Sequence, residues 1–241
     1  MQPVKAGLPA RLDFLQSVSG LFLALFMWLH MVFVSSILLG KDAMYTVARM
    51  FEGQYIFGQP YPGLVSLVVA VVFFIFIAHA GLALRKFPIN YRQYKLFRGH
   101  MKMMQHEDTS LWFVQVYTGF AMFFLGSVHL YIMLTIPIKL APMPRRIAWS
   151  GLMWLYISCC CWRWNSMGGI GLYRLAVKWG WLEGKNPNET RKKLKKAKWG
   201  LTIFFLTLGF LSLAAYIKIG VEHSDRVGER YVPAGIEQQQ H

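Results

Sequence analysis

Acidic residues and cysteines are scarce in this 241-residue chain. It has 11 Asp and Glu against 26 Lys and Arg, which gives a formal net charge of +15, yet 55% of its residues are hydrophobic. An ordinary soluble domain does not combine these two properties. The three cysteines, Cys159, Cys160 and Cys161, are consecutive within an apolar stretch. They lack the spacing of a zinc or iron–sulfur site, so we interpret them as buried small apolar residues.

The sequence also lacks a recognisable cleavable signal peptide, internal repeats and low-complexity segments. The apolar region that begins at Phe14 is too long for the hydrophobic part of a signal peptide, and no small-residue cleavage site follows it cleanly. Basic residues fall between the apolar stretches, as the positive-inside rule predicts for membrane proteins. Nucleic acid is therefore a poor explanation of the charge, and no nucleic-acid partner is expected.

Long apolar stretches dominate what is present. Each is long enough to cross the hydrocarbon core of a bilayer, and prolines lie in several of the intervals between them. We predict an all-α fold, in which residues 1–241 form a single integral membrane bundle of five transmembrane helices. The predicted spans are residues 14–39, 63–84, 111–135, 147–179 and 201–219.

The distribution of Lys and Arg predicts the orientation. With the N-terminus inside, the inner segments hold about twice as many basic residues as the outer ones. The N-terminus is therefore expected to be cytoplasmic and the C-terminus periplasmic. The inner loop at residues 85–108 also contains aromatic and Met residues. It could lie along the membrane surface or dock a soluble partner, and the sequence leaves both alternatives open.

Three histidines fall within the predicted spans, where an imidazole is costly unless it has a partner. His30 and His129 lie in the outer half of the membrane, whereas His79 lies in the inner half. Two imidazoles from different helices at one depth suit the axial ligands of a b-type haem, although a histidine can also simply hydrogen-bond to a neighbouring helix. His79 has no such partner, but Met167 lies in the inner half beside a glycine-rich stretch. A thioether can ligate haem, and Met is equally a common filler of apolar space.

Four segments carry a resemblance to a known family: LFMWLHMVFVSSILLGKD, FIAHAGLALRKFPINYRQY, HEDTSLWFVQVYTGFAMFFLGSVHLYIM and GLYRLAVKWGW. They resemble the di-haem cytochrome b subunit of the fumarate reductase and succinate:quinone oxidoreductase family, in its single-subunit, five-helix type. The resemblance implies two haem b groups stacked across the membrane and held by four histidines. His30 and His129 match the ligands of the distal haem, towards the periplasm, and His79 matches one ligand of the proximal haem.

The chain departs from this family at the fourth ligand. The family histidine stands four residues before the Gly-Leu-Tyr-Arg segment, where this chain has Met167. The proximal haem could be held by His79 and Met167, be five-coordinate, or take another group from a shifted helix. The family also has a glutamate, implicated in returning protons across the membrane, two residues before the ligand. Here that position is Asn165, which cannot carry a proton by ionising.

Further polar residues match family positions that contact the propionates of the proximal haem. These are Gln16, Ser17, Trp112 and Lys178, all near predicted cytoplasmic ends of spans. Arg163 has no such precedent, but an unpaired arginine within a span would be expensive. A haem propionate is one partner for Arg163, and bundle packing with water is the alternative.

Glu52 matches a family glutamate near the distal haem that is implicated in quinol oxidation. A carboxylate at the rim of an apolar pocket can accept a proton from a quinol, although an outer-loop glutamate is by default a solvated acid. The resemblance implies a menaquinol-oxidising subunit of a quinol:fumarate reductase in the bacterial inner membrane. Its partners would be an iron–sulfur subunit and a flavoprotein on the cytoplasmic side, with a dimer of heterotrimers as a further level of assembly. The competing readings are the anchor of another di-haem quinone oxidoreductase and a proton-coupled transporter.

Overall fold

The computed structural model describes residues 7–88, 90–104, 107–135, 167–222, 231 and 233, and every regular element in these residues is helical. A further helix, which carries no label, covers residues 167–178. The labelled elements in chain order are α1 (Gly7–Val34), η1 (Ser35–Leu39), α2 (Lys41–Phe51), α3 (Gln54–Phe57), α4 (Pro62–Leu84), α5 (Tyr91–Met104), α6 (Glu107–Thr135) and α9 (Pro187–Glu222).

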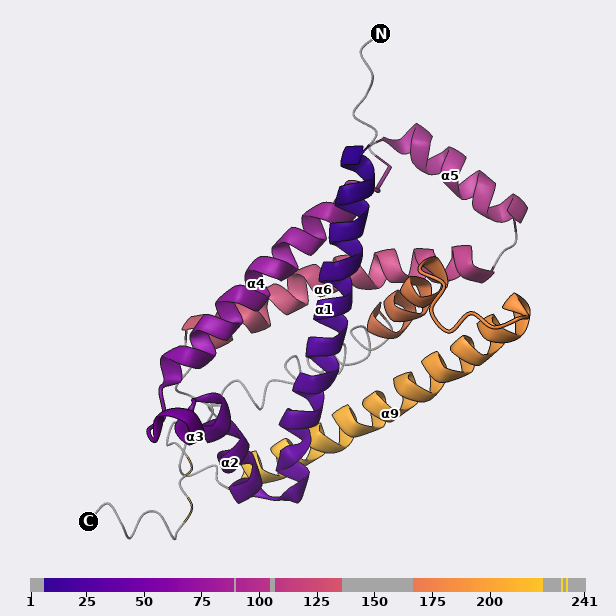
Figure 1. The fold of residues 1–241 in the computed structure, drawn as a ribbon. Helices are drawn as coiled ribbons and strands as arrows, with labels where there is room; N and C mark the ends of the chain where they lie inside the picture. The colour runs from indigo at the N-terminus through magenta and orange to yellow at the C-terminus, as the bar shows by residue number, and fades with distance from the viewer. Residues whose placement is uncertain are drawn as a thin grey trace.

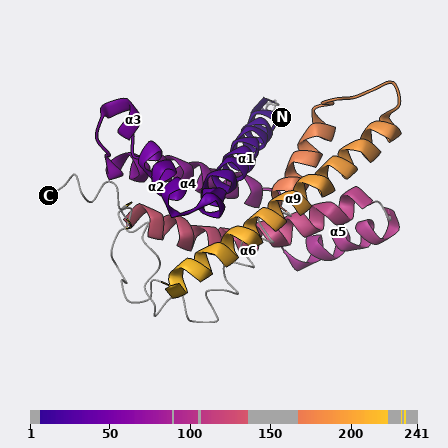
Figure 2. The ribbon, with the colours of Figure 1, turned by 90° about the horizontal axis from the view of Figure 1, so that it is seen from below.

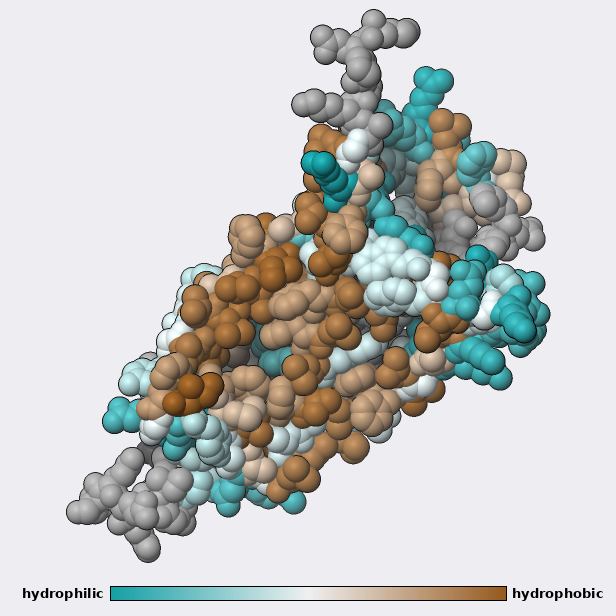
Figure 3. Space-filling model, in the orientation of Figure 1, coloured by the Kyte–Doolittle hydropathy of each residue, from teal (hydrophilic) through white to brown (hydrophobic). Residues whose placement is uncertain are grey.

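Four of these stretches are long and apolar enough to cross a membrane: Gly7–Leu39, Pro62–Leu84, Val114–Thr135 and Pro187–Glu222. They overlap four of the five predicted spans, and the first and last of them begin earlier than predicted. The predicted span at residues 147–179 lies largely outside the described residues, which include only its last part, the helix at residues 167–178. Figure 3 shows a broad apolar belt between hydrophilic patches at opposite ends of the molecule, as expected when lipid covers the middle of a bundle.

The two ends of the bundle can be named by the acidic residues they hold. The start of α1 carries Asp13, whereas the α2–α3 region at the other end of α1 carries Glu52. We call these the Asp13 end and the Glu52 end. Figure 1 shows the start of α1 and α5 at the top, and α2 and α3 at the bottom beside the end of α9.

Contacts between α1 and its neighbours fix their directions. Gly20 lies against His79, and Leu23 packs in one cluster with Phe76, so α1 and α4 are antiparallel. Phe76 in turn stacks on Phe123 with ring centres 5.9 Å apart, which joins α4 to α6. The core of this three-helix unit is therefore aromatic and aliphatic.

Helix α9 runs in the same direction as α1. Trp28 stacks on Phe205 with ring centres 5.3 Å apart, and Ser212 donates a 2.9 Å hydrogen bond to Ser35 near the Glu52 end. A hydroxyl pair at a helix interface is favourable where lipid offers no alternative partner. These contacts hold the last helix against the first.

Helix α5 forms in the loop for which the sequence left two interpretations open. The side-chain oxygen of Asn90 accepts a 2.9 Å hydrogen bond from the backbone N–H of Gln93, so Asn90 caps the start of the helix. Phe97 packs on Trp112 of α6 with ring centres 4.8 Å apart. Figure 2 shows α5 beside the first part of α6, away from α2 and α3.

Candidate functional site

His30 and His129 face each other across the interface between α1 and α6. Their ring centres are 6.3 Å apart and their ring planes are inclined by 57°. His30 also stacks on Phe26, one turn earlier on α1, with ring centres 6.0 Å apart. The two histidines that the sequence puts at one depth therefore lie side by side in the fold.

The spacing of this pair suits a shared metal atom. Two imidazoles on opposite sides of one metal, each with a metal–nitrogen bond of about 2 Å, have ring centres about 6 Å apart. Within the described part of the chain, no three His, Cys, Asp or Glu side chains gather as a group that could hold a metal ion. The distance between the ring centres of His30 and His129 is thus compatible with two imidazoles that share one metal atom.

His79 forms a separate layer nearer the Asp13 end. Its Nδ1 lies 3.0 Å from the hydroxyl oxygen of Ser19, and the Ser19 O–H donates a 2.8 Å hydrogen bond to the carbonyl of Leu15. When Nδ1 carries the proton it donates to Ser19, and Nε2 is then the nitrogen that could ligate a metal, a common arrangement for metal-bound histidine. A Cβ on Gly20 would come within 2.8 Å of Cε1 of His79, so the ring needs a glycine here.

The distance between the two layers follows from helix geometry. Gly20 precedes His30 by ten residues on α1, which corresponds to a rise of about 15 Å. Gly119 likewise precedes His129 by ten residues on α6. Two groups held at these layers would be stacked along the bundle axis.

Met167 approaches α6 at the level of the second layer. A Cβ on Gly119 would lie 3.3 Å from Cε and 3.5 Å from Sδ of Met167. The adjoining turn is held by Arg174, whose Nη1 donates a 2.8 Å hydrogen bond to Oε1 of Gln115. The thioether therefore lies at the depth of His79 on a different helix, although the contact described for it is with Gly119.

The polar residues predicted to contact propionates gather at the Asp13 end. Lys178 donates a 2.8 Å hydrogen bond to the hydroxyl of Ser17, and both Lys178 and Lys86 form ion pairs with Asp13. Oε1 of Gln16 is buried and has no hydrogen-bond partner among the described residues. An acceptor in this position suits a protonated propionate or water.

Trp112 and Arg163 are the other residues predicted to contact a propionate. Trp112 lies in the α5–α6 contact, at the same end of α6 as the polar group. Arg163 lies outside the described residues, as do Asn165 and the three cysteines. Their predicted roles stay predictions.

Glu52 is the most buried acidic residue among those described, with 1% of its surface exposed. Its Oε2 accepts a 3.3 Å hydrogen bond from Nη1 of Arg49, and its backbone oxygen accepts a 2.7 Å hydrogen bond from the N–H of Tyr61. The next residue, Gly53, has a φ of +81°, which a residue with a side chain rarely adopts. The alternative of a solvated loop acid is therefore wrong.

Sequence reasoning did not single out Asp13, Ser19 or Arg49. Asp13 pairs with Lys86, in the turn after α4, and with Lys178, at the end of the helix at residues 167–178, so no local pattern signals the pairing. Arg49 stands one helical turn before Glu52, and that spacing is a signal that could have been used.

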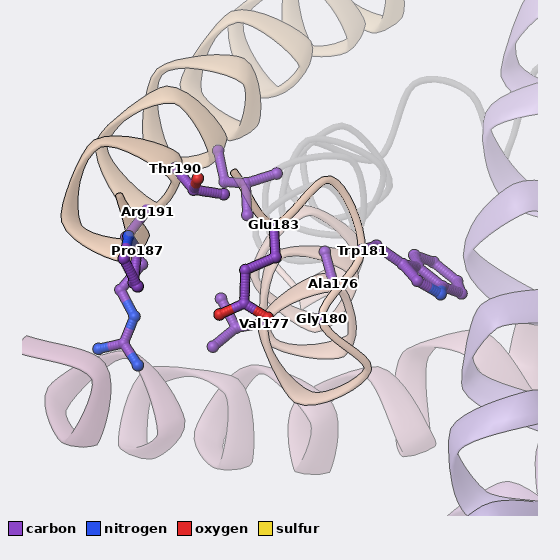
Figure 4. A pocket seen from close by; sticks show the side chains of 9 residues that line it. Ala176, Val177, Gly180, Trp181, Glu183, Pro187, Thr190 and Arg191 are labelled. Atoms are coloured by element: carbon purple, nitrogen blue, oxygen red, sulfur yellow. The ribbon is translucent and has the colours of Figure 1, made fainter. Parts of the chain in front are cut away.

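One pocket among the described residues lies elsewhere, where the helix at residues 167–178 turns into α9 (Figure 4). None of the three intramembrane histidines lines it. Its walls combine apolar side chains with Glu183, Thr190 and Arg191. It is thus a pocket with mixed polar and apolar walls, separate from the two histidine layers.

Comparison with known proteins gives a family match and several similar proteins. The family model described as the succinate dehydrogenase/fumarate reductase transmembrane subunit matches residues 88–210. A fumarate reductase cytochrome b subunit from Wolinella succinogenes is 51% identical over 222 residues, which cover 92% of this chain and 87% of that protein. Two proteins of the same name from Helicobacter pylori strains are 50% identical over 92% of this chain and 86% of their own length.

Proposed function

The chain belongs to the succinate dehydrogenase/fumarate reductase transmembrane subunit family, and on this premise we propose that it is the membrane anchor and quinone-reactive subunit of a quinol:fumarate reductase. It is a multi-pass membrane protein, as the apolar helices indicate. The similar proteins are named cytochrome b subunits, so haem b is the expected cofactor. The observation that carries the proposal is the His30–His129 pair, with ring centres 6.3 Å apart between two membrane helices.

Two haem b groups account for the two histidine layers. His30 and His129 would hold one, and His79 would hold the other together with Met167. When bound, these groups supply the one-electron steps that link a two-electron quinol to an iron–sulfur partner. The hydrogen bond between Ser19 and His79 would orient the imidazole, and Gln16, Ser17, Trp112 and Lys178 would surround the propionates of the group nearer the Asp13 end.

The thioether of Met167 fits the second ligand position for two reasons. It occupies the position that the family resemblance gives to a ligand, and its contact with Gly119 puts it at the depth of His79. A thioether in place of an imidazole raises the reduction potential of a haem. The haem nearer the Asp13 end would therefore accept electrons more readily than with two imidazoles. Arg163 is a further candidate partner for a propionate, on the basis of the sequence alone.

Glu52 is the candidate proton acceptor for quinol oxidation. A quinol releases two protons when it is oxidised, and a carboxylate in a largely apolar setting can take one of them. The burial of Glu52 at the end of the bundle nearer His30 and His129 favours this role over that of a surface acid. We assign the quinol site, with menaquinol as its substrate, to the Glu52 end.

The Asp13 end would then face the cytoplasm and the partner subunits. The basic residues of α5 and the Lys-rich start of α9 lie at this end, as the positive-inside rule requires. An iron–sulfur subunit would dock here and pass electrons to a flavoprotein, where fumarate is reduced. The complex would lie in the bacterial inner membrane, with a dimer of heterotrimers as its larger assembly.

Haem content per polypeptide tests the proposal directly. The complex is purified, haem b is measured by pyridine haemochrome, and protein is measured by amino-acid analysis. We expect two haem b per chain, co-purification of a flavoprotein and an iron–sulfur subunit, and menaquinol-driven fumarate reduction. A colourless chain would refute the proposal and favour a proton-coupled transporter. Two haems without a flavoprotein would favour the anchor of another quinone oxidoreductase.

A further inference from the structure

The Glu52 carboxylate, on the residue that follows α2, ends a connected row of side chains along one side of this helix. Asp42, Tyr45, Arg49 and Glu52 follow one another at intervals of three or four residues, so they share one face of the helix. Nη1 of Arg49 donates to Oε2 of Glu52 at 3.3 Å, and Nε of the same guanidinium donates to the hydroxyl of Tyr45 at 3.0 Å. One rigid guanidinium therefore joins the carboxylate to the tyrosine.

The tyrosine in this row is itself held in place. The guanidinium carbon of Arg49 lies 5.0 Å from the centre of the Tyr45 ring. Tyr231, near the C-terminus, packs edge-on against Tyr45 with ring centres 6.5 Å apart, and its hydroxyl donates a 2.6 Å hydrogen bond to Asp42. The amino group of Lys41 lies 5.3 Å from the centre of the Tyr231 ring. Tyr231 thus holds the row at the end away from Glu52.

Charge alone does not explain this arrangement. An arginine presents several N–H donors in a fixed plane, whereas a lysine is a point charge on a flexible stem. Because one donor is committed to Tyr45, the direction of the other towards Glu52 is set. The side chain of Arg49 is 16% exposed, so little water is available to replace these hydrogen bonds.

We propose that Arg49, fixed by Tyr45, is a positioning residue that sets the orientation of the Glu52 carboxylate for proton acceptance from the quinol. This inference rests on the proposed role of Glu52 in quinol oxidation. Arg49 acts through Glu52 and not on the substrate, and Tyr45 acts through Arg49. Tyr231 supports the same geometry through its contacts with Tyr45 and Asp42.

The test uses the purified complex with two assays. Menaquinol-driven fumarate reduction requires the Glu52 end, whereas a water-soluble one-electron donor that reduces the iron–sulfur subunit directly bypasses it. We expect Tyr45→Phe to lower the quinol-driven kcat about two- to tenfold, the range for one lost hydrogen bond, with little change in KM. The bypass activity and the haem content should stay at wild-type values. Tyr55→Phe removes an exposed hydroxyl from α3 and is the matched control, with wild-type activity in both assays.

Arginine variants separate geometry from charge. Arg49→Lys keeps the positive charge but loses the fixed planar donors of the guanidinium, so we expect it to lower the quinol-driven kcat at least as much as Tyr45→Phe. The double variant Tyr45→Phe with Arg49→Lys should be no worse than Arg49→Lys alone, because the tyrosine acts through the arginine. Full activity of Arg49→Lys, or equal effects of Tyr45→Phe and Tyr55→Phe, would overturn the inference.

Glu52→Gln distinguishes this inference from the function on which it rests. We expect it to lower quinol-driven turnover by about a hundredfold or more while bypass activity is retained. Wild-type quinol activity of Glu52→Gln would refute the proposed role of Glu52 itself. A strong loss in Glu52→Gln combined with normal Arg49 and Tyr45 variants would refute only the positioning role.

Discussion

A methyl group added at Gly20 tests whether His79 is a haem ligand. In Gly20→Ala the new Cβ would lie 2.8 Å from Cε1 of His79, whereas ordinary contacts begin at 3.4 Å. The ring or the helix would have to move by about 0.6 Å, the difference between these distances. Metal–ligand bonds hold to within about 0.2 Å of their preferred length. We therefore expect Gly20→Ala to weaken or remove the haem held by His79 and to leave the haem held by His30 and His129 intact.

The assay combines haem content with a redox titration of the haem absorption bands. We expect haem b to fall from about two towards about one per chain, with one redox component lost or shifted and the other unchanged. Alanine has a helix propensity better than that of glycine by about 1 kcal/mol, so helix destabilisation would not explain the loss. Gly81→Ala is the matched control, because a Cβ there meets nothing within 4 Å, only two residues from His79 on α4. Unchanged haem content and potentials in Gly20→Ala would refute the reasoning.

Two further predictions concern the other layer and the Asp13 end. His30→Ala should remove about half of the haem b, while the redox component assigned to His79 titrates normally. Loss of the His79 component alone in the same redox titration would contradict the pairing of His30 with His129. Asp13→Asn should weaken the ion pairs with Lys86 and Lys178, which are a third to nearly a half exposed, and lower stability by about 1 kcal/mol. Thermal unfolding of the solubilised complex measures this effect, which should shrink in 1 M salt because screening weakens exposed pairs; an effect independent of salt would point to packing instead.

The sequence predicted the helices and the histidine layers well because both depend on simple properties. The apolar stretches of α1 and α4 are long and uninterrupted, so their positions follow from length and hydropathy. The pairing of His30 with His129 follows from depth once the spans are known. Five crossings and the orientation of the chain are still predictions, since the fourth predicted span lies largely outside the described residues.

The environment of Glu52 could not be predicted in this way. Its burial depends on the left-handed turn at Gly53 and on the hydrogen bond from Tyr61, and neither appears in the periodicity of a single helix. The Asp13 ion pairs are equally invisible, because Lys86 and Lys178 come from distant segments. Composition and spacing identify which residues are unusual, whereas tertiary packing decides which of them are buried.

The departure at position 167 leads to a prediction about the gene. The family resemblance implies a histidine where the chain has Met167 and a glutamate where it has Asn165. Tryptophan and methionine have one codon each, so Trp164 and Met167 constrain the nucleotides around them. In the reading frame that begins at the third base of the Trp164 codon, the first triplet is always a glutamate codon. If Ser166 has a TCN codon, the second triplet encodes leucine or phenylalanine. The third triplet encodes histidine, asparagine, tyrosine or aspartate.

The same shifted frame converts the nucleotides of the three cysteines and the tryptophan after them into three leucines, and it removes Arg163 from the apolar segment. This frame encodes apolar residues in the span and an acid two residues before a potential histidine, which agrees with the family pattern. The displaced frame is thus an alternative to a Met167 ligand, and nucleotide sequencing of this region distinguishes the two. Trypsin cleaves after Arg163 and Arg174, so a chain with Met167 yields a peptide of residues 164–174. Detection of that peptide by mass spectrometry in the purified complex would exclude the displaced frame and support the thioether as the ligand. A peptide with glutamate and histidine in its place would mean that two imidazoles hold each haem, with a lower potential at the layer of His79.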